Sequence, residues 1–116
     1  MNEEEMKKRM KAYALRVVKL AASFPNTRLG NVVGYQLTKA GTSVAANYRA
    51  VCRARSRADF VAKLGVVEEE ADESVFWIDF GADAGLTKRN LVQDLATEGN
   101  EIVSIIVASR RTAKGR

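Results

Sequence analysis

Histidine is absent from this 116-residue sequence, and cysteine, proline and tryptophan each occur once. Without histidine, the commonest zinc ligand is missing, as is the base of His-dependent hydrolytic triads, so both kinds of site are excluded. The lone Cys52 cannot close an internal disulfide, and we expect its thiol to pack as a small apolar group.

Long apolar runs are also missing. No segment approaches the roughly 20 apolar residues of a membrane span, and the amino-terminal MNEEEMKKRMKAY lacks the hydrophobic region of a signal peptide. The chain is nevertheless long enough to bury a core without a disulfide or a metal. We expect one cytoplasmic domain spanning residues 1–116.

Apolar residues recur at three- and four-residue steps along four segments, which is the spacing of one face of a helix. We predict helices over about residues 3–23, 28–54, 57–81 and 87–111, with Asn26 or Thr27, then Ser56 and Thr87, at their starts. Short loops between helices of this length favour an all-α, up-down-up-down antiparallel four-helix bundle. The first stripe contains Met6, Met10, Tyr13 and Val17, and the predicted seam of the last helix contains Leu91, Leu95, Ile102 and Ile105.

Positive and negative charges are segregated along the chain, whose net charge is +5. Seven acidic residues and no basic one lie between Glu68 and Asp83, whereas residues 49–63 and 110–116 are strongly basic. A basic face suits a phosphate backbone because lysine and arginine displace condensed counterions, and a tyrosine can stack on a base. The predicted nucleic-acid-binding residues are Tyr35, Lys39, Arg49, Arg53, Arg55, Arg57, Arg110, Arg111 and Lys114. Two other interpretations stay open: a solvated basic face, or one that pairs with the acidic third helix of a neighbouring subunit.

The acidic segment also offers candidate metal ligands. Glu69, Asp72 and Glu73 are spaced so that one helix face could present them, but the Glu-x-x-His pairs of di-iron bundles are absent. We interpret these carboxylates as an acidic outer surface. Asn47 and Glu98 interrupt apolar stripes, where they either fix helix register or line a site. We predict no enzyme activity, no metal and no cofactor.

Several large apolar side chains fall outside the predicted core stripes. An exposed aromatic patch commonly marks a protein interface, because a monomer would leave such groups in water. The alternative is that Phe80 folds over the helix end and Trp77 packs at the bundle edge. We predict a closed homo-oligomer in which each third helix meets a neighbouring chain. The predicted interface residues are Val66, Phe76, Trp77, Phe80, Val103 and Val107.

Three strings resemble a known family: SVAANYRAVCRA, EADESVFWIDF and EIVSIIVASRRTAK. They are similar to the small four-helix-bundle proteins first noticed as open reading frames inside intervening sequences of bacterial large-subunit ribosomal RNA genes. Relatives include the accessory variability protein of diversity-generating retroelements. The resemblance implies a homopentameric ring and, in the retroelement branch, a basic ring that binds nucleic acid and a reverse transcriptase. The family often has an acidic residue two places after the Tyr of the NYR motif, where this chain has Ala50.

Charge and resemblance together favour a non-enzymatic, homo-oligomeric protein that binds RNA or DNA as an accessory to a reverse transcriptase or other nucleic-acid-processing machinery. The second hypothesis is a protein-interaction scaffold whose positive face contacts an acidic protein partner.

Overall fold

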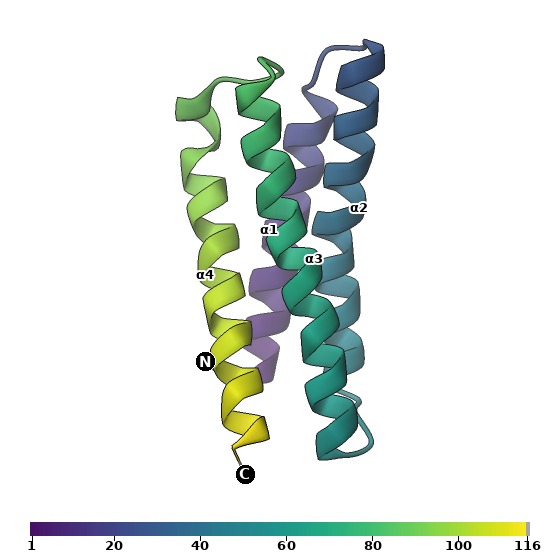
Figure 1. Cartoon of the computed structure of the whole chain (residues 1–116), viewed down its shortest axis with the longest axis vertical. Coiled ribbons are helices and arrows are strands. Elements are labelled where there is room, and N and C mark those ends of the chain that lie inside the picture. Colours follow the sequence, from purple (N-terminus) through teal and green to yellow (C-terminus); the bar gives the residue numbers. More distant parts are fainter. Residues whose placement is uncertain (116) are drawn as a thin grey trace.

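The computed structural model describes residues 1–115, whose helices are α1 (Glu3–Ala22), α2 (Arg28–Val51), α3 (Arg57–Asp83) and α4 (Arg89–Lys114). Figure 1 shows consecutive helices lying side by side and running in opposite directions, in a body of 47 × 22 × 20 Å. No strand occurs among the described residues. The predicted all-α, four-helix class is confirmed. The main helix contacts join α1 to α2, α2 to α3 and α3 to α4, so α1 and α3 lie diagonally opposite.

Two of the predicted helix starts carry the expected side-chain caps. Thr27 Oγ1 accepts a hydrogen bond from the Gly30 N–H at 3.0 Å, and Ser56 Oγ accepts one from the Asp59 N–H at 3.1 Å. The prediction for Thr87 is wrong, because α4 begins at Arg89 after Lys88, which makes no capping bond. α4 also continues to Lys114, beyond the predicted end at residue 111.

α3 continues beyond its predicted end at residue 81. Gly81 lies within the helix, where a Cβ would stand 3.0 Å from the ring of the buried Phe24. The helix stops two residues later because Gly85 adopts φ 79°, a conformation that glycine tolerates. Its N–H donates to the Ala82 carbonyl, and the Leu86 N–H donates to the Gly81 carbonyl, which completes a Schellman motif.

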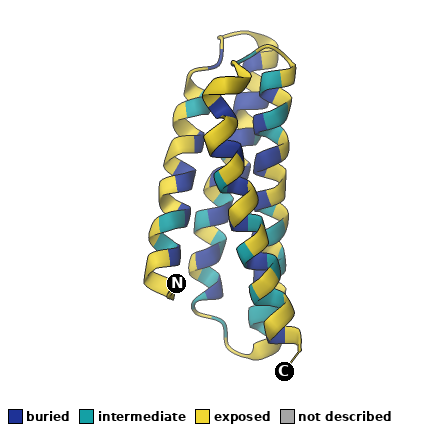
Figure 2. Ribbon diagram, turned by 90° about the vertical axis from the view of Figure 1, so that its left-hand side faces the viewer, coloured by how far each residue is buried: buried dark blue, intermediate teal, exposed yellow. Residues whose placement is uncertain are grey.

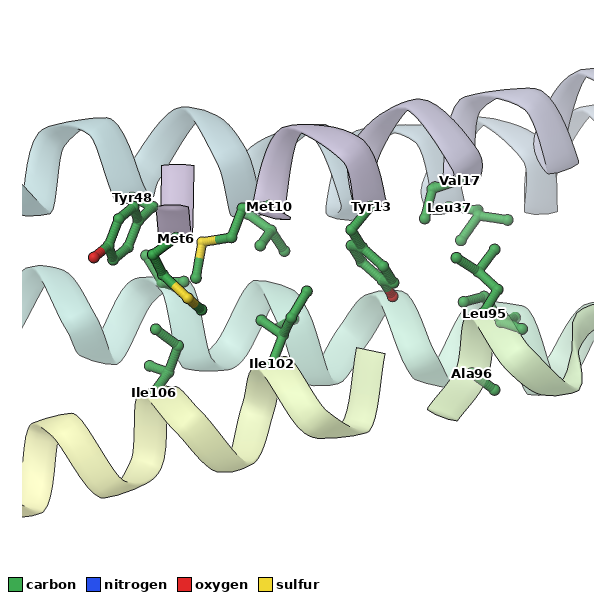
Figure 3. Close-up of a cluster of buried hydrophobic side chains, with 14 of the residues drawn as sticks. Met6, Met10, Tyr13, Val17, Leu37, Tyr48, Leu95, Ala96, Ile102 and Ile106 are labelled. Carbon is green, nitrogen blue, oxygen red and sulfur yellow. The ribbon is translucent and has the colours of Figure 1, made fainter. Parts of the chain in front are cut away.

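Residues coloured as buried line the inward sides of the helices along the molecule, and exposed residues lie on the outside (Figure 2). The predicted α1 stripe is confirmed, and Figure 3 shows its members packed against residues of the other helices. Cys52 is half-buried and packs on this core as expected.

The predicted seam of α4 requires a correction. Leu91 is 71% exposed, and Ile105 only packs at the core edge, whereas Val92 and Ile106 are buried in their place. The buried face therefore follows steps of three and four from Val92 through Gly99 to Ile106. A contact at Gly99 explains this rotation.

Tyr13 crosses the core and joins three helices at one level. Its hydroxyl lies 2.7 Å from Ser74 Oγ, which itself donates to the Ala71 carbonyl at 2.6 Å, so Tyr13 must be the donor to Ser74. A Cβ on Gly99 would lie 2.6 Å from Tyr13 Oη and 2.6 Å from Val75 Cγ2. Only glycine fits there, which fixes α4 against the tyrosine of α1. Burial raises the pKa of Tyr13 to about 12, so the phenol stays protonated as a donor.

This arrangement predicts an asymmetric response to mutation. Ser74→Ala should cost about 1–3 kcal/mol, because it leaves the buried Tyr13 hydroxyl without an acceptor. Tyr13→Phe should cost less, since Ser74 keeps its bond to the Ala71 carbonyl. Urea unfolding followed by circular dichroism measures both. Equal losses in the two variants, or none for Ser74→Ala, would contradict the assigned donor and acceptor.

Candidate nucleic-acid interface

Five of the predicted basic residues gather at one end of the molecule. Figure 1 shows the α2–α3 connection at the same end as the carboxyl terminus of α4. All five side chains are exposed. We call this group the basic end, and its members are Arg53, Arg55, Arg57, Arg111 and Lys114.

Asp59 organises the connection between α2 and α3. Its carboxylate accepts from the Arg55 N–H at 3.1 Å and binds the Lys63 ammonium at 2.6 Å. The hydrogen bond from Lys63 and the one from the Arg55 backbone hold the pKa of Asp59 below its usual range. The carboxylate is therefore engaged with Lys63 and the backbone, while the Arg53 and Arg55 side chains stay exposed to solvent.

A depression of about 720 Å³ lies beside this connection and includes Ala50 in its wall. Arg53, Arg55 and the Lys63–Asp59 ion pair line the same depression. A carboxylate at position 50, as is frequent in the family that the sequence resembles, would stand among these cations and offset them. Alanine leaves the depression with more uncompensated positive charge, which favours an anionic ligand such as phosphate.

Arg110 is placed differently from its neighbours in sequence. Its guanidinium lies over Gly65 of α3, where an added Cβ would be 3.2 Å from Arg110 Cζ, and its Nη1 is 3.6 Å from the Glu68 carboxylate. Among residues 1–115, Nε of Arg110 is buried and has no hydrogen-bond partner. Arg110 thus serves the α3–α4 contact, and Gly65 is what allows the approach.

The remaining predicted residues do not join the basic end. Tyr35 is exposed, but the 1.5 Å rise per residue puts it about 24 Å along α2 from Val51. Lys39 lies close to Glu70 of α3. Burial is the main cause of the raised pKa of Glu70, and the charge of Lys39 opposes this effect in part. Arg49 lines a groove between α1 and α2. The structure therefore divides the nine predicted residues into the five of the basic end, Arg110 in the α3–α4 contact, and three residues elsewhere.

The polar residues within the apolar stripes make structural hydrogen bonds. Asn47 Nδ2 donates to the Ser43 carbonyl at 2.8 Å. Glu98 accepts two bonds from the Arg9 guanidinium, at 2.8 and 2.7 Å, and Arg9 also donates to Glu101 at 2.9 Å. This bridge spans α1 and α4, the least extensive of the helix contacts. Glu98 fits the interpretation that it fixes helix register, whereas the Asn47 bond stays within α2 and satisfies its side-chain amide.

The Arg9 bridge predicts a dependence of stability on pH. Hydrogen bonding to Arg9 lowers the pKa of Glu98 from its ordinary value of 4.5, despite the opposing effect of burial. A depressed carboxyl pKa contributes stability above the unfolded-state pKa and loses it as the pH falls through the folded-state pKa. Wild type should therefore be more stable than Glu98→Gln near neutral pH, and the two curves should converge as the pH falls through the lowered pKa of Glu98.

Urea unfolding of both chains between pH 3 and pH 7 measures this difference. Asp94→Asn, which removes an exposed carboxylate from the same helix, is the matched control and should stay parallel to wild type. A constant gap between wild type and Glu98→Gln across that range would contradict the proposed role of the bridge.

The acidic side of α3 is an outer surface. Glu69, Asp72 and Glu73 are all exposed. Within residues 1–115, no three Asp, Glu or Cys side chains converge as a metal site requires.

None of the described helices is both long and apolar enough to cross a membrane.

Phe76, Trp77 and Phe80 form an aromatic cluster on the same side of α3. Ring centroids lie 4.9 Å apart for Phe76 and Trp77, and 5.6 Å apart for Trp77 and Phe80. Phe76 is 53% exposed and Phe80 is 38% exposed, whereas Trp77 is half-buried against the core. Val66 is exposed elsewhere on the same helix.

Val103 is half-buried and packs against the core of its own chain, so its part in an interface stays a prediction. Val107 is half-buried beside Arg110. Sequence analysis also missed exposed apolar residues on α1 and α2, namely Leu15, Val18, Leu29 and Val32. The available signal was that none of the four belongs to a buried stripe.

Comparisons with known proteins identify the family and the fold. The model of the 23S rRNA-intervening sequence protein family matches residues 2–108. No curated protein matches the chain. Among solved structures, the chain is similar to a protein with unknown function from the S23 ribosomal protein family of Bacteroides thetaiotaomicron. The two share 27% identity and a TM-score of 0.87, and the match covers 96% of this chain and 99% of that chain.

Proposed function

The chain belongs to the 23S rRNA-intervening sequence protein family, and from this membership together with its basic end we propose that it binds RNA or DNA and catalyses no reaction. The observation that carries the proposal is the exposure of Arg53 and Arg55 beside Ala50, where no carboxylate at position 50 offsets them. Arg111 and Lys114 extend the same positive end from α4.

A basic end of this kind recognises phosphate and not base sequence. Each arginine that contacts a phosphate releases condensed counterions, so affinity depends on salt and is largely indifferent to sequence. We infer that the protein acts as an accessory to a reverse transcriptase or another enzyme that processes RNA or DNA, which would supply the chemistry and the target choice.

Self-association strengthens this proposal. We propose a homo-oligomer, with five subunits suggested by the family resemblance, in which the exposed aromatic cluster of α3 is covered. Copies arranged around an axis present several basic ends at once, and phosphate contacts that are weak individually then act together through effective concentration. The second candidate function, a protein-interaction scaffold, is favoured by the same exposed cluster if no nucleic acid binds.

The proposal predicts a specific change in salt dependence. Arg53→Ala/Arg55→Ala should flatten the slope of log affinity against log salt by about 1.4 for single strands or about 1.8 for duplex DNA, because each phosphate contact contributes about 0.7 or 0.9. Fluorescence anisotropy with labelled RNA and DNA of arbitrary sequence, from 50 to 200 mM salt, gives the slope.

The matched control is Arg28→Ala/Lys88→Ala, which removes two exposed positive charges from the opposite end of the molecule. It should leave the slope nearly unchanged. Equal flattening by both double variants would show that only net charge matters. If wild type shows no detectable binding at 50 mM salt, the protein-interaction scaffold replaces nucleic-acid binding as the proposed function.

A further inference from the structure

The outer face of α3 combines carboxylates with aromatic rings. Glu69, Asp72 and Glu73 precede Phe76 and Phe80 along the helix, and all five are exposed. We call these five residues the acidic strip. Exposed phenylalanines flanked by acids suit a partner surface that has an apolar part and a basic part, in the same order along its length.

A groove of about 490 Å³ between α1 and α2 has this composition. Toward the amino terminus of α1 it is basic, and further along α1 its wall becomes apolar at Leu15 and Val18. Leu15 is 62% exposed, so the apolar part is open to a partner. The basic residues are Lys7, Lys8, Lys11 and Arg49, and the other lining residues are Ala14, Thr42, Ala45 and Ala46.

The hydrogen bond between Tyr13 and Ser74 allows the two surfaces to be compared level by level. α1 and α3 run in the same direction, and this contact puts each position of α1 level with the position 61 residues later in α3. Lys8 is then level with Glu69, and Lys11 with Asp72. Leu15 is level with Phe76. Along the bundle axis, each basic or apolar position of α1 thus corresponds to an acidic or aromatic position of α3.

We propose that the acidic strip of one copy of this chain docks in the α1–α2 groove of a second copy. A neighbour related by rotation about an axis parallel to the bundle keeps the same height, so lysines meet carboxylates and Leu15 meets Phe76. Pairing two acidic strips would instead oppose like charges, and so would pairing two grooves. The association is therefore head-to-tail.

Two further features of the fold agree with this docking. α1 and α3 are diagonally opposite, so the groove and the acidic strip of one chain can contact two different neighbours, as a closed cyclic assembly requires. Docking also assigns Lys8, Lys11 and Arg49 to the interface, which leaves the basic end for nucleic acid. The inference rests on the proposed self-association, but it does not depend on nucleic-acid binding.

Two variants that each block one surface test the docking. Leu15→Asp alters the groove and Phe76→Asp alters the acidic strip, and both sites are exposed enough for the fold to tolerate the change. Head-to-tail docking predicts that each variant alone has the mass of one chain, 12.7 kDa. An equimolar mixture should contain a dimer of one copy of each, with about twice that mass and nothing larger, because one intact groove meets one intact strip.

Light scattering coupled to size exclusion measures these masses, and circular dichroism checks helical content. Leu91→Asp, at an exposed leucine of α4, is the control and should keep the wild-type mass. Should Leu15→Asp lose helical content, Lys8→Glu/Lys11→Glu takes its place in the mixture.

Several outcomes would overturn the docking. An unchanged mass for the groove variant would mean that the groove is not used, even if self-association stands. A mixture that remains at one chain would exclude head-to-tail pairing. A wild-type protein with the mass of one chain would refute both self-association and docking, whereas the salt dependence of nucleic-acid binding would be untouched.

Discussion

The hydrogen bond from Tyr13 to Ser74, with Gly99 making room for the phenol, is the contact on which the rest of this structure depends. Most of the core is apolar, and apolar burial is non-directional, so it specifies register less sharply than a hydrogen bond does. A buried hydroxyl must find its acceptor, so the polar pair permits only one register. That register sets which surface residues of α1 and α3 stand at the same height.

Contacts within and between the helices decide which positive charges remain for a ligand. Arg9 is committed to Glu98, Lys63 to Asp59, and Arg110 to the contact over Gly65. Arg53 and Arg55 are exposed because the capped start of α3 turns the chain at the end of the bundle. The net charge of +5 therefore says less about ligand binding than the places where positive charge is not offset by a nearby carboxylate.

Sequence periodicity predicted the class, the α1 stripe and the caps at Thr27 and Ser56, because these depend on local spacing and hydrogen bonding. It placed the end of α3 at Gly81 instead of Asp83, since spacing does not distinguish a glycine packed under Phe24 from one with positive φ, such as Gly85. The α4 seam was wrong because helix rotation is set by a contact distant in sequence. For the same reason, the position of Arg110 and the groove beside Leu15 were not predicted. Both depend on how the helices pack against one another, which the sequence pattern does not give.

The central claim is that the helix register set by Tyr13 and Ser74 brings the acidic strip of one copy level with the groove of another. Disulfide trapping tests this claim most directly. In a Cys52→Ala background, oxidation of a mixture of Leu15→Cys and Phe76→Cys chains should give a cross-linked dimer. A mixture of Lys8→Cys and Phe76→Cys should not, because a seven-residue offset is about 10 Å along a helix, beyond the reach of a disulfide. Cross-linking of Phe76→Cys chains to themselves, or equal yields from both mixtures, would contradict the account.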